Sequence, residues 1–134
     1  MYKTNWHIFG GYGDSTLQTS QIVNENVVVV DGTVLPTAVS HHAITSINKT
    51  VSILSGGDIA DDASSQTFYY NHITKIFTSS PTLLEGRRRH GSATIVDKST
   101  KAKIPVVTGG ANYNWDTMDS TELLINGHWQ KGTI

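Results

Sequence analysis

The chain has 134 residues, no cysteine, and ten Lys and Arg against eleven Asp and Glu, which gives a net charge of −1. The absence of thiols excludes disulfides, thiolate zinc sites and cysteine nucleophiles. The balanced charge argues against nucleic acid or an anionic membrane as a partner, and the length is that of one domain. The sequence has neither the apolar core of a signal peptide nor a membrane-spanning apolar run, so we expect a cytoplasmic protein.

Short runs of branched and aromatic residues, separated by Gly, Asn, Asp and Ser, predict strands along the whole chain and no helix. The first unit is expected to have three strands, at 6–9, 18–23 and 26–30, followed by a turn at 31–32. The second and third units are expected to have four each, at 41–47, 50–55, 66–71, 75–78, 90–96, 104–108, 121–125 and around Trp129. The Asn126-Gly127 pair is the strongest hairpin signal in the chain.

A pair of glycines closes an apolar run three times, and this recurrence organises the chain. The pairs are Gly10-Gly11, Gly56-Gly57 and Gly109-Gly110, so their first members are 46 and 53 residues apart. Residues without Cβ allow turns at backbone angles closed to other residues and let a second backbone approach closely. Three pairs at this spacing predict a repeated four-stranded unit, which is typical of a propeller.

The residues around these pairs resemble the kelch repeat. The third unit carries Leu84, Arg87, Arg88, Arg89 and His90, then Gly109-Gly110, the stretch 120–124, Gly127 and Trp129. The second unit matches with His42-Ala43, Gly56-Gly57, Tyr70 and Phe77. The first matches from Ile8 but has Val23 and Val28 where the two aromatics belong, and Leu124 replaces the first aromatic of the third unit.

This resemblance implies an all-β fold of kelch-type propeller blades in a single partial propeller over 1–134. We place blade one, which lacks a strand, at 4–32, blade two at 39–78 and blade three at 89–131. A closed ring needs at least about four blades, so the predicted ring is incomplete. The chain is then either a fragment of a longer propeller or one that self-associates to close a ring.

The repeat also predicts which aromatics form the core. Phe77 and Trp129 should be buried at equivalent places, with Val28 at that place in the first unit. That unit, one strand short, should be the least stable of the three.

The six histidines do not form a metal-binding pattern. They are scattered over the units, and His42 and His90 occupy equivalent positions, so we expect each to pack and hydrogen-bond within its own blade. Asp58, Asp61 and Asp62 offer clustered oxygen ligands, but their spacing matches no calcium loop. We therefore expect no metal and no other cofactor.

The loops after the glycine pairs are the best candidates for a functional surface. In an up-and-down blade they emerge on the same face as the connection to the next blade, where the basic run 87–89 falls. Exposed aromatics beside hydrogen-bonding residues suit protein recognition. An open alternative is that Tyr113 and Trp115 fold back over the blade end. The predicted partner-binding residues are Tyr12, Asp14, Asp58, Asp61, Asp62, Arg87, Arg88, Arg89, Tyr113, Asn114, Trp115 and Asp116.

Several functions remain open at this point. The kelch resemblance implies a non-catalytic module that binds a protein partner, as in adaptors and scaffolds. A fragment of a galactose oxidase-like propeller enzyme is the alternative, although copper oxidases of that type need a tyrosine–cysteine cross-link that a chain without cysteine cannot form. No pair of carboxylates is placed by the sequence for acid and base catalysis, so we expect a non-enzyme. A non-functional partial gene product is the third possibility.

Overall fold

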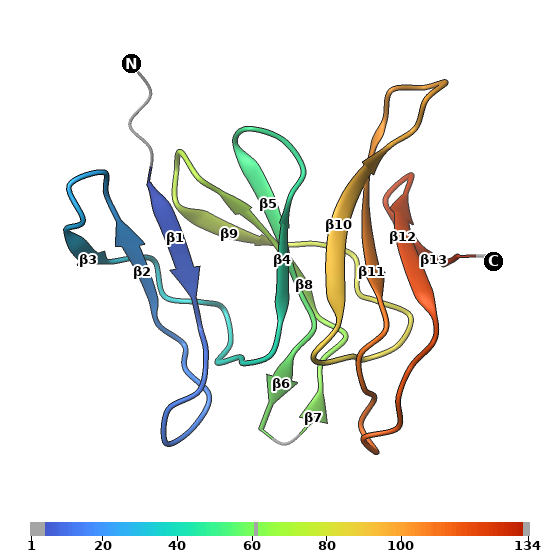
Figure 1. Cartoon of the computed structure of the whole chain (residues 1–134), viewed down its shortest axis with the longest axis horizontal. Helices are drawn as coiled ribbons and strands as arrows, with labels where there is room; N and C mark the ends of the chain where they lie inside the picture. Colours follow the sequence, from blue (N-terminus) through green and yellow to red (C-terminus); the bar gives the residue numbers. More distant parts are fainter. Residues whose placement is uncertain (1–4, 61, 133–134) are drawn as a thin grey trace.

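The computed structural model describes residues 5–60 and 62–132, and in these ranges the chain is entirely β-structure, turns and loops, with no helix. Three antiparallel sheets follow one another along the sequence (Figure 1). Sheet 1 has the order β1 (Trp6–Phe9), β2 (Ser20–Val23), β3 (Val29–Asp31). Sheet 2 has the order β4 (Ala43–Ser46), β5 (Val51–Ser55), β8 (Thr67–Asn71), β9 (Ile76–Ser79). Sheet 3 has the order β10 (Gly91–Val96), β11 (Lys103–Thr108), β12 (Thr121–Ile125), β13 (His128–Lys131).

The all-β prediction is confirmed, with three strands in the first sheet and four in each of the others. Two local predictions are wrong. The third strand begins at Val29 and not at residue 26, because the Asn24 side chain accepts hydrogen bonds from the backbone N–H groups of Asn26 and Val28, and Asp31 belongs to β3 instead of a turn. The loop 58–65 contains a short hairpin of β6 (Asp58–Ile59) and β7 (Asp62–Ala63).

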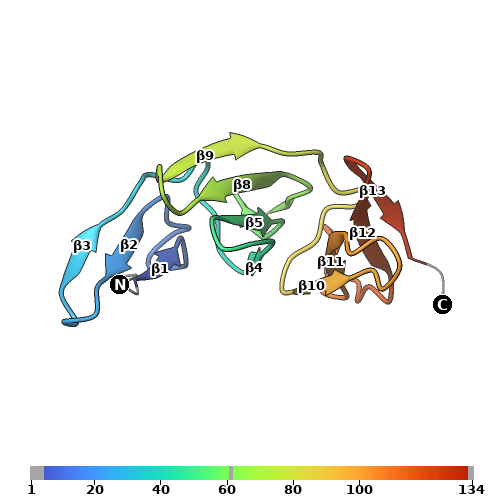
Figure 2. The ribbon, with the colours of Figure 1, turned by 90° about the horizontal axis from the view of Figure 1, so that it is seen from above.

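The three sheets stand side by side in an open arc of blade-like sheets (Figure 2). Strands β4 and β10 lie next to each other on the concave side, where the Thr94 hydroxyl donates to the Ser46 carbonyl at 2.8 Å. Strands β3, β9 and β13 lie on the convex side. Within the described residues, no helix is long and apolar enough to cross a membrane.

The hydrophobic core is split between the two spaces that separate neighbouring sheets. One cluster joins sheets 1 and 2, and the other joins sheets 2 and 3. Adjacent residues of β5 serve different clusters: Leu54 packs in the first and Ile53 in the second. Side chains of a strand alternate between the two faces, so sheet 2 is buried on both faces. The buried members are Phe9, Leu35, Val39, Leu54 and Tyr70 in the first cluster and Ile53, Leu83, Val107, Leu124 and Trp129 in the second.

The predicted aromatic positions are partly correct. Trp129 is buried opposite Leu124, and Phe77 is half-buried opposite Tyr70 and packs against the first cluster. The residue at that place in sheet 1 is Val29, which pairs with Val23. Val28 lies one position earlier, in the turn, because the side chain of Asn24 holds its N–H there.

The glycine pairs take the same backbone conformation in all three sheets. Their φ angles are 57°, 58° and 69° at the first glycine and 117°, 103° and 90° at the second. The N–H of each first glycine donates to the carbonyl of the residue just before the next strand of its own sheet. The N–H groups of Gly11 and Gly57 donate to the carbonyls of Val39 and Arg87, at the entry to the following sheet. A Cβ built on Gly10 or Gly56 would lie 2.4 Å from those same carbonyl oxygens. Glycine is therefore required because successive sheets touch at these points.

The repeated histidines bridge neighbouring sheets. His90 directly precedes β10 of sheet 3, yet its ring is hydrogen-bonded at 2.9 Å to the Ser55 hydroxyl of sheet 2. The rings of His42 and His90 also lie against the positions of Gly10 and Gly56 in the preceding sheets. The expectation that each histidine bonds within its own blade is wrong for His90, because the bend before the inner strand turns the ring toward the preceding glycine pair.

A candidate binding site at the glycine-pair end

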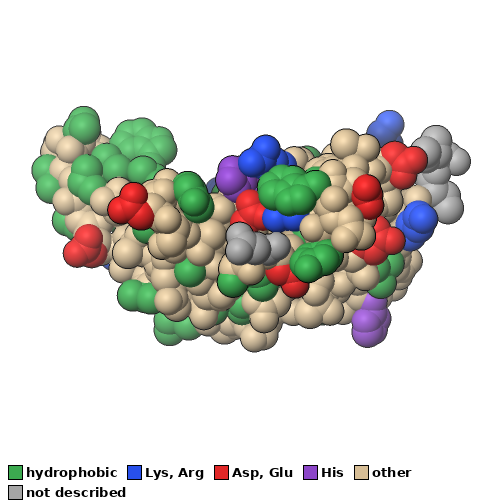
Figure 3. All heavy atoms as spheres, turned by 90° about the horizontal axis from the view of Figure 1, so that it is seen from below, with side chains coloured by type: hydrophobic (Ala, Val, Ile, Leu, Met, Phe, Trp, Pro, Cys, Tyr) green, Lys and Arg blue, Asp and Glu red, His purple; other side chains and the backbone are tan. Residues whose placement is uncertain are grey.

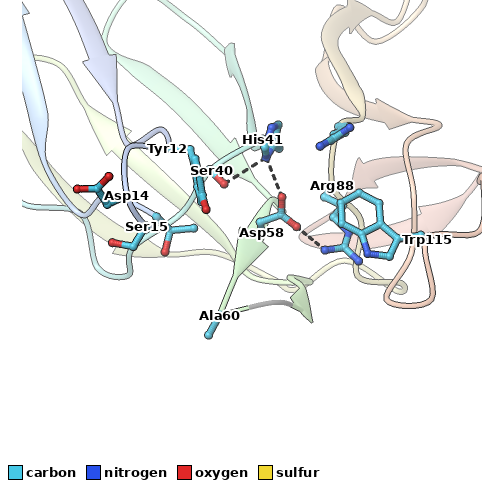
Figure 4. A pocket seen from close by; sticks show the side chains of 11 residues that line it. Tyr12, Asp14, Ser15, Ser40, His41, Asp58, Ala60, Arg88 and Trp115 are labelled. Carbon is cyan, nitrogen blue, oxygen red and sulfur yellow. Dashed lines mark hydrogen bonds and ion pairs between the residues drawn. The ribbon is translucent and has the colours of Figure 1, made fainter.

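A pocket of about 640 Å³ opens at the end of the molecule where the glycine-pair loops lie (Figures 3 and 4). Each sheet or its flanking loops contributes to the lining, so the pocket exists only because the three are docked together. Figure 3 shows side chains of both charges, a histidine and hydrophobic groups meeting near the middle of this end. The lining residues are Tyr12, Asp14, Ser15, Thr16, Ser40, His41, Asp58, Ala60, Arg88, Arg89 and Trp115.

Asp58 holds the centre of the pocket by bridging two basic groups. One carboxylate oxygen is 2.5 Å from the Arg88 guanidinium and the other is 2.7 Å from His41 Nδ1. Asp58 lies in β6, directly after the second glycine pair, whereas Arg88 and His41 precede the inner strands of sheets 3 and 2. The carboxylate therefore ties the entries of two sheets together (Figure 4).

Arg88 is held by an ion pair, two backbone carbonyls and an aromatic ring. Its second guanidinium nitrogen donates to the carbonyls of Asn112 and Tyr113, at 3.2 and 2.9 Å. The face of Trp115 covers the guanidinium, with Cζ 3.4 Å from the ring centroid, and the Arg88 side chain is only 1% exposed. An arginine pinned by an ion pair, two carbonyls and an aromatic face is a rigid floor for the pocket.

The walls are made of exposed groups. Trp115 is 53% exposed and Tyr12 68% exposed. The Arg89 guanidinium lies 5.1 Å from the Trp115 ring centroid, and Arg89 is exposed with no ion pair among the described residues. This surface offers apolar faces, free hydrogen-bond donors and one unpaired cation around a fixed centre. Such a combination is typical of protein-recognition surfaces.

A repeated backbone bend places His41 and Arg89 at the pocket. Both residues directly precede a repeat histidine, and both have a left-handed backbone, with φ of 50° and 56°. The Arg89 N–H donates to the His41 carbonyl at 2.8 Å, which links the two bends. Non-glycine residues rarely adopt this conformation, and here the docking of successive sheets holds it.

The structure brings together six of the predicted partner-binding residues at this pocket: Tyr12, Asp14, Asp58, Arg88, Arg89 and Trp115. Tyr113 lines a smaller neighbouring pocket of about 320 Å³ with Asn112 and Glu85. Asn114 and Asp116 are exposed in the same loop, where their N–H groups donate to the Asn112 side chain. Asp62 is exposed in β7, outside both pockets, and Asp61 lies outside the described residues.

The prediction for Arg87 as a partner-binding residue is wrong, because its side chain is 0% exposed. It forms a buried ion pair with Glu122 at 2.8 Å and also donates to the Gly109 and Ser120 carbonyls. The other carboxylate oxygen of Glu122 accepts the N–H of Leu84. Arg87 therefore anchors the 80–90 connection to sheet 3 from the inside.

The sequence left open whether Tyr113 and Trp115 fold back over the blade end, and the structure gives a different answer for each residue. Both side chains are exposed, at 65% and 53%, so neither is core packing. Trp115 nevertheless covers the Arg88 guanidinium. It is both part of the surface and a support for the residue beneath it.

The sequence interpretation missed the pocket residues Ser15, Thr16, Ser40, His41 and Ala60. A signal for His41 was present, because it occupies the same repeat position as Arg89, one residue before the repeated histidine. Ala60 lies at the β6–β7 turn with a φ of 42°, and alanine there gives no sequence signal for a turn.

Metal coordination has no support in the described part of the chain, where nowhere do three His, Asp or Glu side chains converge as ligands. Asp58 is engaged by Arg88 and His41, and Asp62 accepts the N–H of Ala63. Both carboxylates of the aspartate cluster that the structure describes thus have partners within the protein.

Burial lowers the pKa of the repeated histidines. The pKa of His90 falls from 6.5 to about 4, first because of burial, then through the charge of Arg87 and the proximity of His42. Burial, followed by the proximity of His41, also lowers the pKa of His42. Both imidazoles are therefore neutral at neutral pH.

No protein-family model matches the chain, and no curated protein is significantly similar to it in sequence.

Proposed function

We propose that the chain is a kelch-type partial propeller that works as a non-catalytic binding module, and that it holds a protein partner at the glycine-pair end. The observation that carries the proposal is the pocket shared by all three sheets, with exposed Tyr12 and Trp115 around the buried Arg88 and its partly buried partner Asp58. Aromatic and arginine side chains around a rigid centre are the groups that dominate binding energy at protein interfaces.

The kelch assignment draws its support from the repeat. Three glycine pairs share one backbone conformation, and two repeat histidines fill the same space between successive sheets. The buried Trp129 lies opposite Leu124, as the half-buried Phe77 lies opposite Tyr70. These are the positions on which the sequence resemblance rests.

The proposal can be tested by placing a photo-crosslinking amino acid at Tyr113, which is exposed beside the pocket, and identifying the protein that is captured. The matched control carries the same group at Ile76, which is 56% exposed on β9, away from both pockets. A partner captured at position 113 and not at 76 is the expected result. Equal capture from both positions would contradict a site at this end.

Two further variants separate binding from folding. Arg89→Ala removes an exposed cation and should weaken partner binding about tenfold or more while leaving the melting temperature within the range of ordinary surface substitutions. Trp115→Ala should weaken binding as strongly but also destabilise the fold by about 1 kcal/mol, since it uncovers Arg88. Unchanged affinity in both variants would overturn the proposed site.

One observation favours catalysis as a second candidate. His41 and Asp58 form a hydrogen-bonded pair at 2.7 Å at the pocket, an arrangement that can serve a general base. The nearby Ser40 hydroxyl, 3.2 Å from the same imidazole nitrogen, is only 1% exposed, so a substrate cannot reach it as a nucleophile. Two results together would exclude this candidate. The His41→Gln variant would still bind the captured partner, and the parent protein would cleave no bond in that partner.

A further inference from the structure

The free edge of β1 faces a groove of about 820 Å³ between sheets 1 and 2, at the end opposite the pocket described above. In sheets 2 and 3 the strand that ends in the glycine pair has an inner neighbour: β4 pairs with β5, and β10 pairs with β11. Strand β1 pairs with β2 on one side, and no described residue pairs with its other side. The groove lies where that inner neighbour would be.

The surroundings of the glycine pairs are independent evidence that sheet 1 lacks an inner strand. A Cβ on Gly57 would lie 2.9 Å from the Cβ of His42, and one on Gly110 would lie 2.9 Å from the Cβ of His90. These histidines belong to the inner-strand entry of the same sheet. At Gly11, the equivalent glycine, no described atom lies within 4 Å of the added Cβ. The place of a histidine is therefore open beside Gly11.

The backbone after the glycine pair gives a second sign. Asp58 and Ser40 exchange two backbone hydrogen bonds, at 2.7 and 3.2 Å, and Ala111 and Arg88 exchange two at 2.9 and 3.0 Å. Tyr12 holds the corresponding place in sheet 1, and among the described residues its backbone pairs only with Thr16. A chain entering beside Gly11 would complete the same pair of bonds with Tyr12.

The groove walls define the side chains that such a chain would need. His7 and Phe9 point from β1 toward Tyr70 of sheet 2. Ile44 of β4, which is 39% exposed, lines the same groove. In the complete sheets the residue after the repeat histidine is small, Ala43 or Gly91, and pairs with the last residue of the next strand. The same register would set a small residue opposite Phe9 and a branched or apolar one opposite His7, against Ile44.

We propose that this groove binds an extended polypeptide segment of a partner, which adds to β1 as an antiparallel fourth strand and carries histidine followed by alanine or glycine. The main-chain bonds to the edge of β1 supply affinity, as in other strand-addition complexes. The histidine beside Gly11 and the small residue opposite Phe9 set the register. The added strand would reach Tyr12, which is also a wall of the pocket at the glycine-pair end, but its ladder along β1 involves no other residue of that pocket. Either proposal can therefore fail without the other.

The test uses a synthetic peptide with the sequence of residues 39–47, VSHHAITSI, which contains the proposed motif. Titration into the full chain, followed by amide hydrogen exchange, should give one-to-one binding and new protection at Trp6–Phe9. A peptide with N-methyl groups on the backbone nitrogens that face β1 should lose this binding, because it cannot complete the ladder. Retained binding of the methylated peptide would overturn the proposal.

Gly11→Ala is the decisive protein variant, because its added Cβ meets nothing in the described structure but would strike the incoming histidine. It should weaken the peptide at least about tenfold. Gly127→Ala is the control, because it also places alanine at a positive φ, 78°, and meets no described atom within 4 Å, and it should leave peptide affinity unchanged. Ile44→Glu provides a second variant that leaves the glycine pair intact and should also weaken binding. Equal affinity in all variants, or protection confined to the loop 111–116, would refute strand addition at β1. Concentration-dependent protection of β1 without peptide that is lost in Ile44→Glu but kept in Ile8→Glu, a change outside the groove, would instead show a second copy in the groove and would also refute the proposal.

Discussion

Three adjacent arginines have three different roles, set by the direction in which each side chain leaves the 80–90 connection. Arg87 is buried against Glu122, Arg88 is pinned beneath Trp115, and Arg89 is exposed. A buried charge is tolerated only with a partner and further hydrogen bonds, and both buried arginines have them. Removing either partner carboxylate would leave an uncompensated buried cation.

The glycines offer a matched comparison at the residue scale. Gly57→Ala should destabilise the fold by about 1 to 3 kcal/mol more than Gly11→Ala, because its Cβ would meet Ser40 and His42 while that of Gly11 meets no described atom. Both residues have φ near 110°, so the backbone strain is shared and cancels in the comparison. Denaturant unfolding of the two variants measures the difference, and equal losses would show that crowding between sheets is not why these glycines are required.

The His90 pKa predicts acid sensitivity. The folded pKa of about 4 lies below the unfolded value of 6.5, so between these values the unfolded chain binds the proton that the folded chain refuses. The free energy of unfolding should therefore fall as the pH drops from 6.5 to 4, by about 3 kcal/mol from this residue at most. The lowered pKa values of His7, His42 and His72 act in the same direction.

His90→Gln keeps a hydrogen-bonding side chain and removes the titration. Its unfolding free energy, measured between pH 7 and 4, should depend less steeply on pH than that of the parent chain. An unchanged slope would show that His90 is not responsible.

At the scale of elements, the 80–90 connection joins sheets 2 and 3 as much as any strand does. Leu83 enters the second core cluster, and the Trp129 indole N–H donates to the Pro81 carbonyl at 2.7 Å. The connection is therefore packed between the outer strand of one sheet and the inner strand of the next. Because this connection is buried, its residues contribute much of the packing between sheets 2 and 3, although the segment has no regular secondary structure.

Trp129→Ala should destabilise the protein by about 3 to 5 kcal/mol, because the side chain is 96% removed from solvent and its loss opens the second cluster. Trp129→Phe keeps most of the packing and loses the bond to Pro81, so it should cost less. Chemical denaturation provides both values. A phenylalanine variant as unstable as the alanine variant would show that the hydrogen bond, and not the packing, dominates at this position.

At the scale of the whole molecule, the two end sheets each have one apolar face that no described residue covers. Sheet 1 exposes Ile8 and Val29, and sheet 3 exposes Ile95 and half-buries Val106 and Leu123. The faces that point toward a neighbouring sheet are buried in the two core clusters. Exposed apolar faces favour association with another protein molecule.

We therefore predict self-association that rises with concentration. Ile8→Glu should reduce it, since it charges the free face of sheet 1, while Val27→Glu, in the exposed turn, should have little effect. Light scattering or sedimentation across a concentration series tests this. A monodisperse monomer for the parent chain would contradict the prediction.

Stability should also vary along the array. Sheet 1 has three strands and one packed face, whereas sheet 2 is buried on both sides. Amides of Ser20–Val23 should exchange faster than those of Val51–Ser55, because local opening follows the amount of buried contact. Slower exchange in sheet 1 would contradict the expectation that it is the least stable.

The sequence by itself determined the local features of this protein. Period-two patterns, the Asn126-Gly127 turn and the glycine pairs predict strands and their ends, because each depends on the backbone freedom of one or two residues. The turn held by the Asn24 side chain, the β6–β7 hairpin and the left-handed bends at His41 and Arg89 fell outside those rules. The repeat added the number of sheets, since identical local signals recurred in the same order.

The tertiary structure alone decided which side chains are buried and which surfaces of neighbouring sheets meet. Whether an arginine of the run 87–89 is buried or exposed depends on Glu122, Asp58 and Trp115, which lie 26 to 35 residues away in the chain. The pocket and the β1 groove arise where separate sheets meet or fail to meet. Docking is cooperative among residues distant in sequence, so no local pattern could specify it, and the surfaces proposed to bind partners are the part of this protein that only its three-dimensional arrangement reveals.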